Sequence, residues 1–192
     1  MIDRAQILVV AATERELAPA NGWLTVLCGV GPVEAAISTA VAIEKYHPRA
    51  IVHVGIAGAR REAALAPAAI VIGSESRYCD LHIAAEWARS HVIAPATLLR
   101  AAQRALPDAS TRCIGTSANI GGSRECDVEA MEGFAVLRAA ERAGIPAIEV
   151  RSISNEIEEH DRARWHFDHA FAAITAITPR LVDEIARSVT DA

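Results

Sequence analysis

The chain has 192 residues, of which 52% are hydrophobic and 22% charged, and its formal net charge is −5. This many apolar side chains can bury a substantial core, which predicts a single globular domain over residues 1–192 and excludes a disordered chain. The negative charge argues against a protein that binds nucleic acid through phosphate attraction. The cysteines are sparse and form no CxxC pair, which excludes a disulfide-rich scaffold.

Apolar runs in the chain are short. None reaches the roughly 18–20 uncharged apolar residues that a membrane-spanning helix needs. The run at residues 7–12 is too short for the core of a secretory signal peptide, and Glu14 and Glu16 follow it. We therefore expect a cytoplasmic protein with no membrane partner and with four reduced cysteines: Cys28, Cys79, Cys113 and Cys126.

The first half of the chain alternates apolar runs with helical patterns. An uninterrupted apolar run is typical of a strand that is buried on both faces. Thr13 and Glu16 have the spacing of a capping box, and Pro32 opens an alanine-rich amphipathic stretch that extends to Tyr46. Such runs predict strands at residues 7–12, 23–28, 50–54, 68–73 and 78–83.

The second half continues this alternation. Gly144 is placed to end a helix, and Pro179 predicts a break or kink in the last helical segment. Helices are predicted at residues 95–105, 129–143 and 164–188, strands at 112–115 and 146–153, and a polar loop at 116–126. The pattern predicts an α/β fold, a three-layer sandwich in which helices cover both faces of a mainly parallel, mixed sheet.

Polar residues and glycine turns follow several of the predicted strands. Glu16 follows the strand at 7–12, Asn155 follows the strand at 146–153, and the turns are 29–32 and 55–58. Ligands bind at the carboxyl ends of strands in open α/β sheets, so we expect these groups to converge. No Ser-His-Asp set is evident.

Each of these features also has a simpler structural explanation. Glu16 fits a helix cap, and Gly29-x-Gly31 fits a tight turn, because a dinucleotide site needs a third glycine and a later acidic residue. Glu132 fits the start of a helix, where the dipole favours a carboxylate. Its neighbours Met131 and Gly133 are apolar or small, however, and a buried carboxylate needs a partner.

Metal binding has little support. His166 and His169 are three residues apart on a predicted helix, but no further ligand accompanies them. The charged run at 156–162 fits a solvated loop. We therefore predict no metal and no cofactor.

Five segments in this order resemble the purine nucleoside phosphorylase and nucleosidase superfamily: residues 7–16, 29–36, 54–58, 130–135 and 145–155. Within it the chain is most similar to the futalosine hydrolases. That narrower resemblance rests on residues 29–33, 55–59, 77–80, 153–155 and 160–162, and on Trp165. The sister group is the nucleosidases that act on methylthioadenosine and S-adenosylhomocysteine.

The resemblance implies a role for each matching residue. It makes Glu16 the carboxylate that activates water, Glu132 the one that holds the ribose hydroxyls, and Asn155 the side chain at purine N7 and its six-position substituent. Trp165 or Phe167 would cover the site. The remaining positions would line the sugar or the base: Val30, Ile56, Ala57, Asn119, Ile120 and Met131.

Asn155 indicates which purine is released. The adenine-cleaving relatives carry aspartate at this position, and a protonated aspartate can give N7 a proton. An amide cannot, but it accepts at one purine position and donates at another, which suits a six-oxo purine. We therefore expect hydrolysis of futalosine to hypoxanthine and dehypoxanthine futalosine, a step of menaquinone biosynthesis. Its aromatic carboxylate needs a cation, for which Arg77 and Arg162 are candidates.

Three alternatives remain open: a methylthioadenosine/S-adenosylhomocysteine nucleosidase, a phosphate-dependent phosphorylase, and a non-catalytic nucleoside-binding protein. His53 and Ile56 stand where phosphorylases of the superfamily hold phosphate with arginine and serine or threonine, which favours water as the nucleophile. The resemblance also implies a homodimer or larger assembly.

Overall fold

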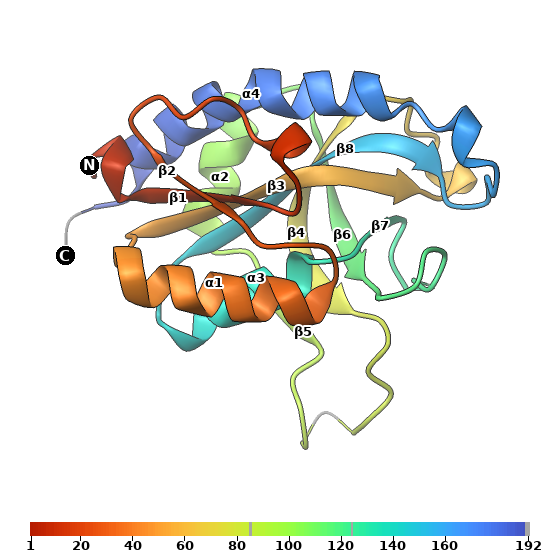
Figure 1. Cartoon of the computed structure of the whole chain (residues 1–192), viewed down its shortest axis with the longest axis horizontal. Coiled ribbons are helices and arrows are strands. Elements are labelled where there is room, and N and C mark those ends of the chain that lie inside the picture. Colours follow the sequence, from red (N-terminus) through yellow and green to blue (C-terminus); the bar gives the residue numbers. More distant parts are fainter. Residues whose placement is uncertain (85, 124, 191–192) are drawn as a thin grey trace.

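The computed structural model describes residues 1–190 except 85 and 124. A twisted sheet lies between two helical layers, with α2 and α4 on one face and α1 and α3 on the other (Figure 1). The predicted α/β class and its helix-covered mixed sheet are therefore confirmed. The strands are β1 (Ile7–Ala11), β2 (Leu24–Leu27), β3 (Ala50–Ala59), β4 (Ile70–Tyr78), β5 (His91–Ile93), β6 (Ser110–Thr116), β7 (Val128–Ala130) and β8 (Ala147–Glu156).

The sheet order is β2-β1-β3-β7-β6-β4-β5, and β8 bridges β3 and β4. Strands β3, β8, β4, β6 and β7 therefore pair in a closed ring, with β1 and β2 extending the sheet from β3. Pairing is parallel except between β3 and β7, β4 and β5, and β4 and β8. The buried cores lie under α2 and α4, under α1 and α3, and inside the ring.

The helices are α1 (Pro32–Tyr46), α2 (Ala96–Ala105), α3 (Gly133–Arg142) and α4 (Phe167–Ser188). Proline opens α1 as predicted, and Gly144 follows α3 in the left-handed region at φ +71°. The predicted break at Pro179 is wrong, because α4 runs through it. None of the helices described by the model is both long and apolar enough to cross a bilayer.

Four strand predictions need correction. β3 does not turn after Val54, because residues 55–59 continue to pair with β8. The strand expected at 68–73 is β4, which continues to Tyr78, and the separate strand expected at 78–83 is absent because the chain turns after Tyr78. Strands β5 and β7 have three residues each, too few for a recognisable pattern, and β7 occupies the start of the segment expected to be helical.

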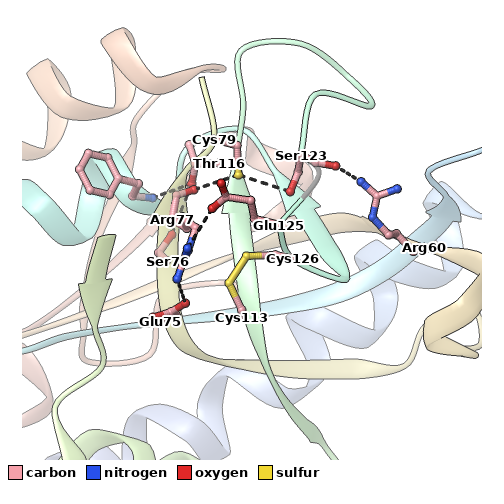
Figure 2. The surroundings of a disulfide bond; sticks show 11 residues. Arg60, Glu75, Ser76, Arg77, Cys79, Cys113, Thr116, Ser123, Glu125 and Cys126 are labelled. Atoms are coloured by element: carbon pink, nitrogen blue, oxygen red, sulfur yellow. Dashed lines mark hydrogen bonds and ion pairs between the residues drawn. A yellow bond between two sulfur atoms is a disulfide. The ribbon is translucent and has the colours of Figure 1, made fainter. Parts of the chain in front are cut away.

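One pair of cysteines is oxidised, which corrects the expectation that all four are reduced. Cys113 on β6 and Cys126, just before β7, form a disulfide (Figure 2). Their spacing carries no signal in the sequence. Pairing of β6 with β7 brings their Cα atoms to 5.4 Å, within the range of a disulfide. Cys28 and Cys79 are free and buried.

Candidate active site

A cavity of about 170 Å³ lies where β1, β3, β7 and β8 end. It contains nine of the predicted site residues: Glu16, Val30, Ile56, Ala57, Ile120, Met131, Glu132, Asn155 and Trp165. Asn119 is not among its lining residues; its N–H donates to Ser117 Oγ, 3.0 Å away, within the loop. The sheet thus brings together side chains that are far apart in the sequence.

Glu16 ends the short 3₁₀ turn Glu14–Glu16 that follows β1. Its Oε2 accepts hydrogen bonds from the backbone N–H and the hydroxyl of Thr13, each 2.9 Å away. Its Oε1 accepts from the N–H of Ile56 on β3, at 3.0 Å. The capping arrangement is therefore present, but it also aims a buried carboxylate into the cavity.

Glu132 precedes the first residue of α3 and is 4% exposed. Its Oε1 accepts from the N–H of Gly31, at 3.1 Å, so the glycine turn that precedes α1 contacts it directly. Burial raises the pKa of Glu132, while the positive charge of Arg151 and the Gly31 N–H oppose that rise. Glu132 Oε2 lies 3.5 Å from Arg151 Nη2.

Arg151 is a functional candidate that the sequence reasoning missed. It is fully buried on β8, and its Nε donates to Glu149 Oε1 at 2.8 Å. Its Nη2 contacts His53 Nε2, and His53 Nδ1 donates to the Val10 carbonyl at 3.0 Å. The missed signal was an arginine and a glutamate inside an apolar run, since such residues are fully buried only when paired.

His53 is held in its neutral form. Burial lowers its pKa well below 6.5, and the charge of Arg151 lowers it further. With a proton on Nδ1, the free lone pair of Nε2 accepts the Arg151 hydrogen bond. His53 therefore orients the Arg151 guanidinium, and both of its ring nitrogens are already engaged, so it is not available to bind phosphate.

Gly55 allows the Arg151 guanidinium to approach Glu16. A Cβ at this position would overlap Arg151 Nη1 and stand 2.8 Å from Glu16 Oε1. The Arg151 guanidinium and the carboxylates of Glu16 and Glu132 therefore form one buried cluster. A residue with a side chain at position 55 would separate them.

Asn155 lies near the end of β8 and is 8% exposed. Its Nδ2 donates to the Glu156 carbonyl at 2.9 Å, and its Oδ1 accepts from Ser154 Oγ at 2.8 Å. These two bonds fix the amide and leave one N–H and one lone pair for a ligand.

A family model for the phosphorylase superfamily matches residues 20–118. Futalosine hydrolase of Streptomyces coelicolor is 32% identical over 192 residues, covering 84% of this chain and 79% of its own. The 5′-methylthioadenosine/S-adenosylhomocysteine nucleosidase of Shewanella halifaxensis is 31% identical over 151 residues, 66% of this chain and 65% of its own. The chain belongs to the phosphorylase superfamily.

Solved structures of the superfamily share the fold. The methylthioadenosine/S-adenosylhomocysteine nucleosidase of Colwellia psychrerythraea, in complex with adenine, matches with a TM-score of 0.84 at 19% identity, covering 96% of this chain and 97% of that one. Because the sequence relatives are nucleosidases, this member of the superfamily is an enzyme of the N-glycosyl hydrolase type.

Two aromatic residues that line the enzyme's cavity each have an arginine beside the ring. Trp165 and Phe171 line it, with Arg162 5.7 Å from the Trp165 ring centroid and Arg15 4.3 Å from that of Phe171. Arg77 does not line the cavity and is ion-paired to Glu75 and Glu125 (Figure 2). Its candidacy as a substrate cation is therefore wrong.

The Cys28 thiol does not supply a nucleophile. Cys28 is buried beside the acidic cluster; burial raises its pKa to about 12, and the charge of Glu132 adds to the rise. It therefore stays protonated near neutral pH and is not a nucleophile. Among the residues that the model describes, no three histidine, cysteine or acidic side chains gather as a metal site. His166 and His169 stack on each other with ring centroids 5.9 Å apart.

Proposed function

We propose that the enzyme hydrolyses the N-glycosidic bond of futalosine and releases hypoxanthine. The observation that carries this proposal is the amide of Asn155, which is fixed by two hydrogen bonds and keeps one donor and one acceptor for the purine. Donation from Nδ2 to a six-oxo group would stabilise the negative charge that develops on departing hypoxanthine. The similarity to the Streptomyces coelicolor protein supports this choice of substrate.

Water is the nucleophile in this proposal. Glu16 takes a proton from water as the water oxygen bonds to the anomeric carbon. The glycosidic C–N bond breaks and its electron pair leaves with the purine, which takes up a proton from solvent, while Glu16 releases to solvent the proton it took from water. Glu132 accepts hydrogen bonds from the ribose hydroxyls and stabilises the positive charge on the sugar.

Arg151 supports this chemistry from behind the carboxylates. Burial alone would favour a protonated, neutral Glu132, and the cation opposes that effect. Glu149 and His53 fix the orientation of the guanidinium. We infer that Arg151 keeps Glu132 ionised, which the enzyme needs if this carboxylate is to stabilise an oxocarbenium-like sugar.

The far end of the substrate must also be recognised. Futalosine carries an aromatic carboxylate, and Arg162 lies beside an aromatic ring that lines the cavity. We propose that Arg162 pairs with this carboxylate. The product that leaves is dehypoxanthine futalosine, which places the enzyme in menaquinone biosynthesis.

Two further activities fit less well. A phosphorylase would need phosphate ligands where this chain has Ile56, which has no hydrogen-bonding side chain, and His53, whose ring nitrogens are both engaged. In the proposed pose Nδ2 donates to the six-position, so the six-amino group of an adenine nucleoside would set two donors against each other. A nucleoside-binding protein without turnover would not need Glu16 and Glu132 in one cavity.

Chromatography of the released base tests the proposal. The protein is incubated with futalosine, methylthioadenosine or inosine, each with and without phosphate. We expect hypoxanthine from futalosine at a rate that does not depend on phosphate. Adenine from methylthioadenosine would overturn the substrate assignment, a sugar phosphate would establish a phosphorylase, and binding without any free base would establish a non-catalytic protein.

A further inference from the structure

A third buried carboxylate, Glu129 on β7, borders the same cavity and has no role in the proposed reaction. It is 7% exposed, and β7 lies between β3 and β6 in the ring. Its Oε1 accepts from the N–H of Gly121 and its Oε2 from the N–H of Ser123. Both oxygens are therefore bound to one loop, residues 117–123, which we call the base loop.

The base loop reaches the substrate cavity through Ile120. Ile120 lines the cavity although it is 48% exposed, so the packing of its own side chain does not hold it there. Its neighbour Gly121 has φ +79°, a conformation that glycine adopts easily. The position of Ile120 must then be set by the contacts that hold the loop backbone on either side of it.

Other side chains hold the ends of the base loop. Asp80 accepts from the Ser117 hydroxyl at 2.8 Å and from the Ala118 N–H at 2.7 Å. Arg60 donates to the Ser123 carbonyl, and the Cys79 thiol contacts the Ser123 hydroxyl (Figure 2). Glu129, which lines the cavity, binds the N–H groups on both sides of residue 122.

We propose that Glu129 is a positioning residue that fixes the base loop, and with it Ile120, against the purine of the bound nucleoside. The inference rests on the proposed nucleosidase function and assigns to Glu129 a role in binding the base. A carboxylate suits this task because each oxygen can accept one N–H, and the negative charge strengthens both bonds. A glutamine would turn an NH₂ group toward one of the two N–H donors and release that side of the loop.

The kinetic signature follows from where Glu129 acts. Its two oxygens face the loop, so it contributes equally to binding the substrate and the transition state. Losing such an interaction raises KM and leaves kcat nearly unchanged. A residue that merely supported the fold would lower the amount of active enzyme instead, without changing KM.

The test compares the kinetics of Glu129→Gln with those of a matched control. Glu125→Gln removes an exposed carboxylate from the segment that follows the loop. We expect Glu129→Gln to raise KM about tenfold or more with kcat within about twofold, and Glu125→Gln to change neither. Hydrogen exchange at residues 117–123 should become faster in Glu129→Gln alone. An unchanged KM and unchanged exchange would overturn the proposal.

A double-mutant cycle tests whether the effect passes through Ile120. Ile120→Ala should raise KM, and adding Glu129→Gln should raise it little further, because the two changes remove one interaction. Fully additive effects would contradict action through Ile120. If Glu129→Gln does not fold, Arg60→Met loosens Ser123 from outside the cavity, and the same rise in KM is expected; an unchanged KM would count against the proposal.

Failure of the proposed function has a different outcome. Wild-type protein that releases no base from any purine nucleoside would refute the nucleosidase assignment and this refinement together. An active wild type with an unaffected Glu129→Gln variant would refute the refinement alone.

Discussion

Glu16 and Glu132 are both buried in the cavity, yet their surroundings differ. Glu16 accepts three hydrogen bonds, two of them from backbone N–H groups. Glu132 accepts one backbone N–H and faces the guanidinium of Arg151. Two carboxylates in different environments can take different parts in one reaction, as the proposed base and sugar clamp do.

Glu16→Gln tests the base assignment. The amide keeps the size of the side chain but cannot take a proton from water. We expect kcat to fall by about 10³-fold or more, while binding of hypoxanthine measured by calorimetry stays within a few-fold. Glu14→Gln, an exposed carboxylate in the same turn, serves as the control and should retain activity. Near-normal turnover by Glu16→Gln would remove Glu16 from this role.

His53 makes the stability of the fold depend on pH. Its pKa is lowered in the folded protein, so below pH 6.5 the unfolded chain binds a proton that the folded chain does not. Stability is therefore present above pH 6.5 and lost as pH falls toward the folded pKa, by up to about 1.4 kcal/mol per pH unit.

Urea unfolding at pH 7.5 and pH 5.5 checks this expectation. The free energy of unfolding of wild type should fall between these values by about 1 kcal/mol more than that of His53→Asn. Equal pH dependence in the two proteins would show that His53 takes up a proton over the same pH range in the folded and unfolded chains, contrary to its hydrogen bonds to Val10 and Arg151.

Sequence reasoning found the polar residues where apolar runs end and missed the buried charged residues inside strands. Glu16 and Asn155 come where apolar runs end, so their convergence could be predicted from the sheet rule. Glu149 and Arg151 lie inside an apolar strand and Glu129 in a three-residue strand, so no boundary marked them. Their role depends on partners from β3, α3 and the base loop, which a single sequence does not pair.

At the scale of elements, β3 continues as a strand where the sequence predicted a turn, and this continuation positions residues of the site. Residues 55–59 look like a glycine turn, but β8 supplies a parallel partner for each of them. The continued strand places the Ile56 N–H against Glu16 and leaves the space above Gly55 to Arg151. The absence of a side chain at Gly55 therefore allows the buried charged groups of Arg151 and Glu16 to approach each other.

Gly55→Ala should separate that cluster. The added methyl would displace the Arg151 guanidinium and crowd Glu16, and displacements of about 1 Å at a reacting centre can cost on the order of 10²-fold in rate. Gly73→Ala on β4 is a milder comparison, since its Cβ would stand 3.2 Å from Ile114 and 3.3 Å from the Glu149 carbonyl, which are tight contacts without an overlap. Steady-state rates with melting temperatures distinguish a site defect from unfolding. A Gly55→Ala enzyme with full activity would contradict the described packing.

At the scale of the whole molecule, one sheet gathers all eight described strands, and we propose that the chain is a single domain. One part of its surface is apolar. Val33, Ile37 and Val41 form a stripe along α1 and are 67%, 57% and 62% exposed. An apolar depression of about 540 Å³ lies beside this stripe, between α1 and α3. Such a surface is typical of an interface, and we propose that it joins two copies of the chain.

Ile37→Arg tests this assembly. A buried, unpaired charge at the centre of the interface should convert the dimer to a monomer, as measured by light scattering after size-exclusion chromatography. Ala176→Arg, at an exposed position of α4 on the opposite face, should leave the mass unchanged. Val30 is exposed and also lines the cavity, so we expect activity to fall with dissociation. A wild-type monomer would contradict the proposal.

The proposed role of Asn155 in selecting futalosine is tested most directly by kcat/KM for futalosine and for methylthioadenosine, measured in wild type and in Asn155→Asp. We expect wild type to prefer futalosine by at least about 10³-fold, because Asn155 Nδ2, placed to donate to a six-oxo group, would face a second donor in a six-amino group. The aspartate should shift this ratio toward methylthioadenosine by about 10²-fold or more. An unchanged ratio, or a wild-type preference for methylthioadenosine, would contradict the role of Asn155 and the proposed substrate.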